Sequence, residues 1–258
     1  MWGWARTIAG TTSSTIGDRC FTLPPLKCLI SPNILPEDKN CIRRLIVNRF
    51  DFSTSRNNMV RLLKKMGIKD ELVLKAMGKV KRHLFVPKSG RFWFGSDPYG
   101  DYPLPIGFGQ TVSQPFIVAY MLEKLKLTAG EKVLEIGAGS GYLAAVLDEM
   151  GVEVYTVEII EELAVTAGKR LGESVHIRTG DGYNGWPEQA PFDAVVVSCA
   201  PDSIPDALTK QLTVNGRMIL PVGTTHQRLV RVVKTNGKIE LHNDLAVRFV
   251  PMFHWIES

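Results

Sequence analysis

A run of strand-forming residues at 133–136, followed by glycine at every second position (Gly137, Gly139 and Gly141), constrains the fold of this chain more than any other feature of its sequence. The pattern is typical of a buried strand that turns sharply into a helix, because only glycine lets the backbone turn and approach a ligand so closely. The fingerprint of dinucleotide-binding folds requires its third glycine at the position of Tyr142, so this pattern is a different one. A glycine-rich turn without any ligand is the alternative interpretation.

Alternating strand and helix patterns continue after the glycines. The segment 192–197 is almost continuously apolar, as expected of a central parallel strand that is buried on both faces. The sequence therefore predicts an α/β fold: a doubly wound, Rossmann-like open sheet with helices on both faces and a ligand beyond the carboxyl ends of its strands. The other predicted strands are 152–158, 175–179 and 218–222, and the predicted helices are 141–150, 160–171 and 203–212.

Acidic residues stand at the ends of the predicted strands. Glu135 lies at the end of the first strand, Glu158 ends the second, and Asp181 follows the third in a glycine-flanked turn. In a nucleotide-binding βαβ unit, an acid in the position of Glu158 accepts hydrogen bonds from both ribose hydroxyls. S-adenosylmethionine (AdoMet) has no pyrophosphate, and its cationic methionine end and its ribose need such acceptors. The combination resembles motif I of the AdoMet-dependent methyltransferases. A solvated strand end for Glu158 and a simple turn residue for Asp181 are the alternatives.

Charge, hydropathy and cysteine usage exclude several classes of protein. Of 258 residues, the first 58 hold eight Lys and Arg against four Asp and Glu, whereas the remainder holds 23 against 22. A nearly neutral domain lacks the basic groove that nucleic acid requires. No apolar run approaches about 18 residues, so no membrane span is expected. The cysteines fit no zinc-ligand pattern. We therefore expect free thiols, no metal site and a cytoplasmic monomer. The four cysteines are Cys20, Cys28, Cys41 and Cys199.

Residues 1–58 differ from the rest of the chain and are predicted to form an irregular leader. Three explanations stay open for it: a misassigned start with translation beginning near Met59, an organellar transit peptide, or an added docking segment. From Met59 onwards, apolar residues at helical spacing predict helices. We expect the methyltransferase domain to span 59–258. Within it, 59–115 forms a helical N-terminal part with the active-site loop, and 116–258 forms the Rossmann-like core with a C-terminal substrate segment.

Four motifs resemble the protein-L-isoaspartate (D-aspartate) O-methyltransferase family. They are Arg-His-x-Phe-Val-Pro at 82–87, Gly-x-Gly-Gln-Thr-Val-Ser-Gln-Pro at 107–115, the motif I glycines, and Val-Arg-Phe-Val-Pro at 247–251. The block at 107–115 is found almost exclusively in this family. The resemblance covers the chain from about residue 59 to its C-terminus. One departure is Ser198-Cys199, where the family usually has glycine and alanine. These residues are small too, so altered packing is expected without lost function.

The resemblance implies a protein-repair enzyme. Such an enzyme transfers a methyl group from AdoMet to the free α-carboxylate of L-isoaspartyl and D-aspartyl residues in damaged proteins and peptides, and releases S-adenosyl-L-homocysteine. A carboxylate is already ionised at neutral pH and needs no base, which agrees with the absence of a catalytic triad in the sequence. The implied catalytic residue is Ser113, whose hydroxyl would hold the carboxylate without acting as a nucleophile. A turn or helix N-cap role for Ser113 is the alternative.

The same resemblance implies a set of binding residues. The residues implied for AdoMet are Gln110, Thr111, Val112, Ser113, Glu135, Gly137, Gly139, Gly141, Glu158, Ile159, Asp181, Gly182 and Gln227. The residues implied for the peptide groove are Pro201, Val247, Arg248, Val250 and Pro251. Two other functions stay open. One is an AdoMet-dependent methyltransferase that acts on another carboxylate or on RNA, and the other is a non-catalytic adaptor that binds AdoMet or isoaspartyl protein.

Overall fold

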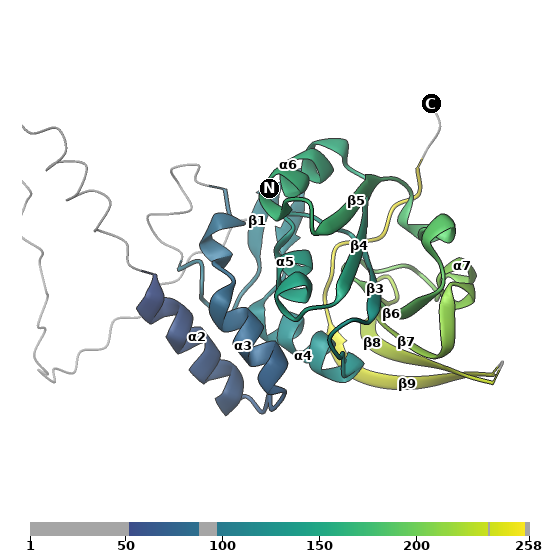
Figure 1. The fold of residues 1–258 in the computed structure, drawn as a ribbon, viewed down its shortest axis with the longest axis horizontal. Helices are drawn as coiled ribbons and strands as arrows, with labels where there is room; N and C mark the ends of the chain where they lie inside the picture. The colour runs from purple at the N-terminus through teal and green to yellow at the C-terminus, as the bar shows by residue number, and fades with distance from the viewer. Residues whose placement is uncertain (1–51, 88–96, 237, 256–258) are drawn as a thin grey trace, which may run out of the picture. The chain divides into compact units, whose positions relative to one another are not determined.

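A seven-stranded sheet forms the centre of the computed structural model, which describes residues 52–87, 97–236 and 238–255. The strand order is β5-β4-β3-β6-β7-β8-β9. The first five strands in this order are parallel, and β8 and β9 run antiparallel at one edge (Figure 1). The strands are β3 (Lys132–Ile136), β4 (Glu153–Glu158), β5 (Val175–Thr179), β6 (Phe192–Val197), β7 (Leu212–Val222), β8 (Gln227–Thr235) and β9 (Lys238–Val247).

The two faces of the sheet bury separate apolar cores, because alternate residues of each strand point to opposite sides. On one face, Val133 and Val154 pack with residues of the helices α2, α3, α4, α5 and α6. On the other, Leu134 and Tyr155 pack with α7 and the short turns before β6. These elements are α2 (Ser53–Lys65), α3 (Glu71–Lys79), α4 (Pro115–Leu125), α5 (Tyr142–Glu149), α6 (Glu161–Leu171), α7 (Asp206–Lys210), η1 (Arg82–Leu84), η2 (Gly182–Asn184) and η3 (Pro187–Gln189).

This architecture confirms the predicted α/β fold with helices on both faces of a Rossmann-like sheet. The antiparallel strands β8 and β9 were not predicted, nor was the small hairpin of β1 (Leu104–Gly107) and β2 (Gln110–Val112). Apolar residues do alternate along β9, at Ile239, Leu241, Leu245 and Val247, but most of this strand is exposed and Asn243 interrupts the pattern. Among the described residues, no helix combines the length and the apolar character that a membrane crossing requires.

The predicted limit between leader and domain at residues 58 and 59 is wrong, because it falls inside α2. This helix begins at Ser53, and Met59 in its middle is buried with 2% of its surface exposed. The Phe52 ring also stacks on the His83 ring, with centroids 4.5 Å apart. A chain that began at Met59 would therefore lack the first half of α2. The predicted irregular leader lies almost entirely outside the described residues and stays a prediction.

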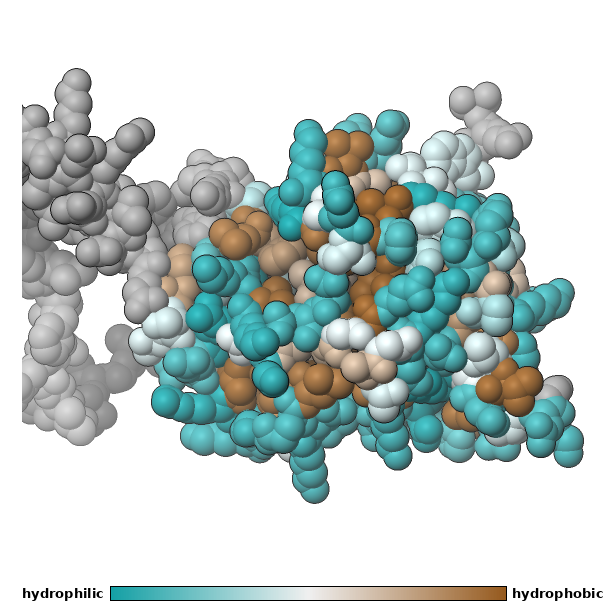
Figure 2. All heavy atoms as spheres, in the orientation of Figure 1, coloured by the Kyte–Doolittle hydropathy of each residue, from teal (hydrophilic) through white to brown (hydrophobic). Residues whose placement is uncertain are grey.

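The helical face presents a mostly polar surface, and Figure 2 shows polar side chains interrupted by small apolar areas. The strongest polar link described beneath the surface joins the end of α4 to the sheet. Arg217 of β7 forms two hydrogen bonds of 2.6 Å to the two carboxylate oxygens of Glu131, and its Nε donates to the Leu125 carbonyl. Both charged side chains are largely buried, with 17% and 21% exposed. Burial alone raises the pKa of Glu131, but the hydrogen bonds from Arg217 and the Thr128 N–H outweigh it and lower the pKa below its usual value.

We expect Arg217→Met to lower the free energy of unfolding by about 2–4 kcal/mol at pH 7, because it leaves a largely buried carboxylate without its partner. The depressed pKa of Glu131 contributes stability above the carboxyl range, and this contribution is lost as the pH falls. The effect of the substitution should therefore shrink below about pH 4.3. Urea denaturation from pH 7 to about pH 3 measures it. Lys64→Met is the matched control, because the exposed Lys64–Glu71 ion pair should contribute about 1 kcal/mol or less. Equal effects of the two substitutions would contradict the assignment.

Candidate active site

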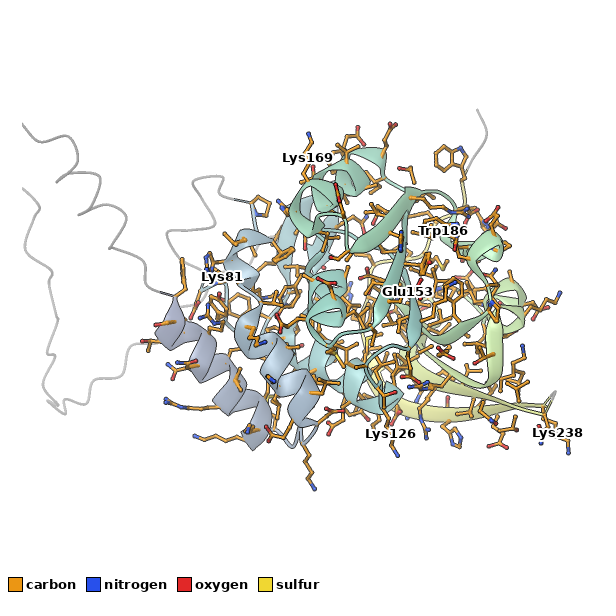
Figure 3. All side chains as sticks on the ribbon, in the orientation of Figure 1. Lys81, Lys126, Glu153, Lys169, Trp186 and Lys238 are labelled. Atoms are coloured by element: carbon orange, nitrogen blue, oxygen red, sulfur yellow. The ribbon has the colours of Figure 1, made fainter. Side chains whose placement is uncertain are left out.

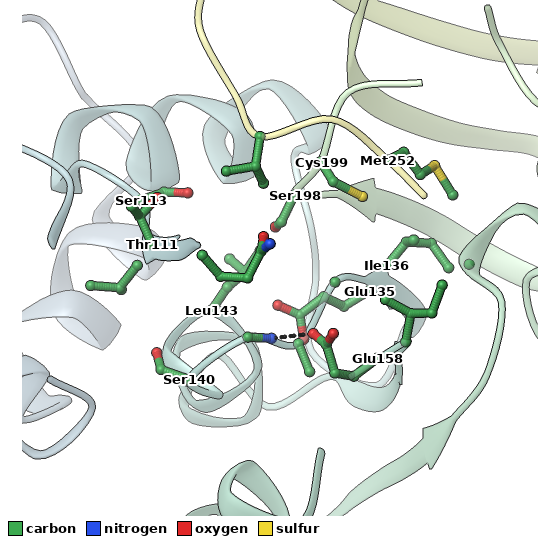
Figure 4. Close-up of a pocket in the computed structure, with 18 of the residues that line it drawn as sticks. Thr111, Ser113, Glu135, Ile136, Ser140, Leu143, Glu158, Ser198, Cys199 and Met252 are labelled. Atoms are coloured by element: carbon green, nitrogen blue, oxygen red, sulfur yellow. Dashed lines mark hydrogen bonds between the residues drawn. The ribbon is translucent and has the colours of Figure 1, made fainter. Parts of the chain in front are cut away.

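A cavity that is partly open to solvent lies at the carboxyl ends of β3, β4 and β6 (Figure 4). Parallel strands place all their carboxyl ends at one edge of the sheet, which is where open α/β sheets bind ligands. The β1–β2 hairpin and the chain after β9 complete its wall. The lining segments are 110–113, 135–140, 142–143, 157–160, 198–199 and 250–253, together with Val118, Met121 and Gly182.

The glycine turn after β3 forms one wall of this cavity. Gly137, Gly139 and Gly141 have φ angles of +88°, +53° and +86°, a region that side chains with a Cβ rarely adopt. A Cβ on Gly141 would also come within 3.2 Å of Ala167 in α6. Gly141 thus allows α5 and α6 to pack closely and does not line the cavity itself.

Glu158 ends β4 and ties the glycine turn to this strand. One carboxylate oxygen accepts a 2.7 Å hydrogen bond from the Gly139 N–H, and the other accepts a 3.0 Å bond from the Ile160 N–H. Only 5% of the residue is exposed. A carboxylate offers about four acceptor positions, so both oxygens keep lone pairs for a ligand in the cavity.

Glu135 is fully buried, and neither of its carboxylate oxygens has a well-aligned hydrogen-bond partner among the described residues. Burial raises the pKa of Glu135 to about 8. A buried carboxyl without a donor is costly, and such groups are rare in folded proteins. Glu135 pairs with Thr156 on the neighbouring strand, and hydrogen bonding to the Thr156 hydroxyl opposes the effect of burial on this pKa. Glu135 also lines the wall of the cavity, so a ligand there can reach its carboxyl group. The site therefore lacks a cationic group at this point, and the ammonium of a methionine moiety would supply it.

Ser113 lies between β2 and α4, where the cavity meets a second hollow. This outer groove has a volume of about 1050 Å³, and Arg248 is the one charged residue that lines it within the described part of the chain. Four residues line both hollows: Thr111, Ser113, Ser198 and Val250. The predicted catalytic serine thus stands at the junction of the two.

The structure contradicts the alternative that Ser113 is the N-cap of α4. The N-cap residue is Gln114, which makes no side-chain capping bond of its own. Instead, the Phe116 N–H in the first turn donates a 2.8 Å hydrogen bond to the carboxylate of Asp101. The Ser113 hydroxyl is therefore not needed to cap this helix.

Most residues predicted to bind the cofactor do line the cavity, with three exceptions. Besides Gly141, Asp181 lies outside it; its carboxylate accepts hydrogen bonds from the Tyr183 N–H and from the Trp255 N–H. Gln227 is also outside, because its side-chain amide bonds both the N–H (2.6 Å) and the carbonyl (3.1 Å) of Phe249. Those that line the cavity are Gln110, Thr111, Val112, Ser113, Glu135, Gly137, Gly139, Glu158, Ile159 and Gly182.

Most residues predicted for the peptide groove line one of the two hollows, and Pro201 is the exception. Val247, Arg248 and Val250 line the outer groove, while Pro251 lines the inner cavity. Pro201 lines neither, and its carbonyl accepts a hydrogen bond from Gly223. The sequence analysis did not identify several other lining residues. In the groove these are Gln114, Ser198 and Phe249, and in the cavity Tyr142, Cys199, Met252 and Phe253.

Arg82 of the 82–87 motif holds the segment that precedes β1. It is completely buried, and it donates hydrogen bonds to the carbonyls of Pro98 (2.8 Å) and Tyr102 (3.3 Å). Its guanidinium also lies over the Tyr142 ring, 5.0 Å from the centroid. Arg82 therefore joins the segment before β1 to the first residue of α5. Among the described residues, no group of His, Cys, Asp or Glu is arranged to hold a metal ion.

Known proteins resemble this chain over its whole described domain. The family model of the protein-L-isoaspartate (D-aspartate) O-methyltransferases matches residues 54–255. A protein-L-isoaspartate O-methyltransferase of Gloeobacter violaceus is 55% identical over 196 residues, which are 74% of this chain and 94% of that protein. A solved protein-L-isoaspartate O-methyltransferase has a TM-score of 0.68 at 31% identity, covering 76% of this chain and 65% of its own, just under two thirds.

The match to a second solved structure covers almost all of the solved chain. That structure is a putative protein-L-isoaspartate O-methyltransferase from Plasmodium falciparum in complex with S-adenosyl-L-homocysteine. Its TM-score is 0.67 at 26% identity, and the match covers 77% of this chain and 98% of that one. Because the family model spans most of the chain and the Gloeobacter relative is more than half identical, the chain belongs to the protein-L-isoaspartate (D-aspartate) O-methyltransferase family.

Proposed function

We propose that the inner cavity binds AdoMet, that the outer groove binds an isoaspartyl polypeptide, and that the methyl group passes to the substrate carboxylate at Ser113. The product of this protein-repair reaction is a methyl ester and S-adenosyl-L-homocysteine. The observation that carries the proposal is the position of Ser113, which lines both hollows at their junction. When bound, AdoMet supplies an activated methyl group.

The residues around the junction would act by binding and orientation. In this proposal the Ser113 hydroxyl donates a hydrogen bond to one oxygen of the substrate carboxylate, so that the other oxygen faces the inner cavity. Glu135 receives the ammonium of the cofactor, and Glu158 its ribose hydroxyls. Val250, which also borders both hollows, excludes water from the junction. Exclusion of water favours a reaction in which opposite charges cancel.

Two features argue against the alternative functions. An RNA substrate would require a basic track along the groove, but Arg248 is the one charged residue that lines the groove in the described part of the chain. Lys81, Lys126, Lys169 and Lys238 lie apart from one another on the domain (Figure 3). An adaptor without activity would not need a cavity and a groove that share the lining residue Ser113. We further propose a cytoplasmic monomer whose catalytic domain begins with α2, so that the leader precedes it.

The proposed substrate can be tested directly. Two peptides that differ only in an aspartyl or isoaspartyl linkage are incubated with labelled AdoMet. We expect base-labile methyl ester on the isoaspartyl peptide and almost none on the aspartyl peptide, because only the former offers a free α-carboxylate within the chain. Equal labelling of both peptides, or labelling of neither by protein that binds AdoMet, would contradict the proposed function.

Ser113→Ala should slow methyl transfer about ten- to 150-fold, since a hydrogen bond to a charged group contributes roughly 1.5–3 kcal/mol. The melting temperature and the affinity for S-adenosyl-L-homocysteine should change little, because Ser113 does not cap α4. Single-turnover rates, melting curves and calorimetry measure the three quantities. Ser203→Ala, at an exposed serine that lines neither hollow, is the control. An unchanged rate of methyl transfer in Ser113→Ala would show that the Ser113 hydroxyl does not orient the substrate carboxylate.

Glu135→Gln should weaken binding of S-adenosyl-L-homocysteine about ten- to 150-fold, because it removes the anion that faces the ligand ammonium. Since the pKa of Glu135 is raised to about 8, the free protein carries a proton there at pH 7. Binding of a cation requires the ionised form, so the wild type should release a proton on binding and the variant should not. Calorimetry at pH 7 in buffers of different ionisation enthalpy measures this proton.

The control is Glu161→Gln, which changes an exposed glutamate at the start of α6. It should leave both affinity and proton release unchanged. If Glu135→Gln releases the same proton as the wild type, then Glu135 is not the group that faces the ammonium.

A further inference from the structure

Gln114 directly follows Ser113, and it is one of the residues that line the outer groove. Its Nε2 donates a 2.7 Å hydrogen bond to one carboxylate oxygen of Asp101. An ionised carboxylate only accepts hydrogen bonds, so the amide nitrogen of Gln114 must face Asp101 and the amide oxygen must face away from it. This contact fixes an orientation that would otherwise be ambiguous for a glutamine.

The amide oxygen of Gln114 accepts no hydrogen bond from any residue in the described part of the chain. Gln114 is half-buried, and it is absent from the lining of the inner cavity. Its oxygen is thus a free acceptor on the wall of the groove, one residue from the serine that borders both hollows.

Asp101 is itself held from two sides. Its second carboxylate oxygen accepts the 2.8 Å hydrogen bond from the Phe116 N–H, where a negative charge is favourable at the start of α4. The neighbouring residues Pro98 and Tyr102 are bound through their carbonyls by the buried Arg82. The orientation of the Gln114 amide is therefore set before any substrate arrives, which lowers the entropic cost of binding.

The chemistry of an isoaspartyl residue suggests what this acceptor binds. In that residue the α-carbon carries both the free carboxylate and the residue's own backbone N–H, because the chain continues through the side-chain carbonyl. We infer that the Gln114 amide oxygen accepts a hydrogen bond from this N–H while Ser113 holds the carboxylate, and that Asp101 is the residue that positions the amide. The inference rests on the proposed function and adds a second contact to the same substrate residue.

A backbone contact of this kind also agrees with a substrate that is any damaged polypeptide. The N–H is present whatever side chains flank the isoaspartyl residue. Ser113 would then bind the carboxylate and Gln114 the N–H of the same α-carbon. In a normal aspartyl residue, that α-carbon carries a peptide carbonyl in place of the carboxylate.

The experiment compares three isoaspartyl hexapeptides at saturating AdoMet: the plain peptide, one with N-methyl on the isoaspartyl nitrogen, and one with N-methyl two residues away. For the wild type, we expect methylation of the isoaspartyl nitrogen to raise the KM about five- to tenfold and the remote N-methyl to have little effect. Gln114→Met should raise the KM for the plain peptide by a similar factor, and N-methylation should then have little further effect. Its affinity for S-adenosyl-L-homocysteine should be unchanged.

Asp101→Asn tests the positioning role. An asparagine can donate to the Gln114 oxygen, which would turn the amide nitrogen towards the groove and replace the acceptor with a donor. We expect a raised KM and lost sensitivity to N-methylation, with kcat changed much less than KM. A merely structural role would lower the melting temperature and leave this sensitivity in place.

Several outcomes would overturn the inference. One is a wild-type KM that does not respond to N-methylation of the isoaspartyl nitrogen, a result that requires no variant to fold. Another is an equal response in the wild type and in Gln114→Met. Failure of the wild type to methylate the plain isoaspartyl peptide would instead contradict the proposed function, so the two failures can be told apart.

Discussion

Parallel pairing of β3 with both β4 and β6 is the constraint on which the rest of the structure depends. It brings the ends of three buried strands to one edge, where Glu135 and Glu158 stand within the same cavity wall. Neither carboxylate could stay buried there without compensation. Glu158 is compensated by two backbone N–H groups of the turns that it ties together, whereas Glu135 has no well-aligned donor within the described protein and lines the cavity. The same strand pairing therefore places one acid that ties the glycine turn to β4 and a second, buried acid that a cation in the cavity can reach.

The structure divides binding between two hollows that share only a few residues. The inner cavity is built on the strand ends, and these are the most buried part of the molecule. The outer groove is built on the hairpin, the start of α4 and the chain after β9, which are more exposed. The buried inner cavity suits a small cofactor whose chemical groups never vary. The more exposed outer groove suits a polypeptide whose side chains differ from one substrate to the next. Contact between them is restricted to the neighbourhood of Ser113 and Ser198, so the reacting atoms can meet there without the two ligands sharing a site.

The sequence was sufficient for the features that follow from local periodicity. The strands β3 to β6, the glycine turn and the acid that ends β4 were predicted within one residue of their observed positions, because burial on both faces and positive φ angles leave clear marks in a sequence. Strand β7 was predicted only from residue 218, whereas it begins at Leu212, where the sequence analysis still expected a helix. What the sequence could not reveal depends on contacts between distant residues. Gln227 bonds Phe249, 22 residues away, and Asp181 bonds Trp255, 74 residues away. No local pattern distinguishes such an anchor from a ligand contact. The N-terminal limit was missed for a similar reason, since the packing of Phe52 on His83 joins segments that no periodicity connects.

Asp181 and Gln227, which lie outside the cavity, nevertheless bear on both hollows through the C-terminal segment. This segment crosses the end of the sheet, where Ala200 donates a 2.8 Å hydrogen bond to the Val250 carbonyl and accepts another of the same length from the Met252 N–H. Gln227 holds the segment just before this crossing and Asp181 holds it just after. Between the two anchors, Phe249 lines the groove, Val250 lines both hollows, and Met252 lines the cavity. A single strip of backbone thus forms a wall for the peptide and a wall for the cofactor. Loosening either anchor would alter both hollows at once, so Asp181 and Gln227 can influence binding by holding this strip in place, whether or not they contact a ligand.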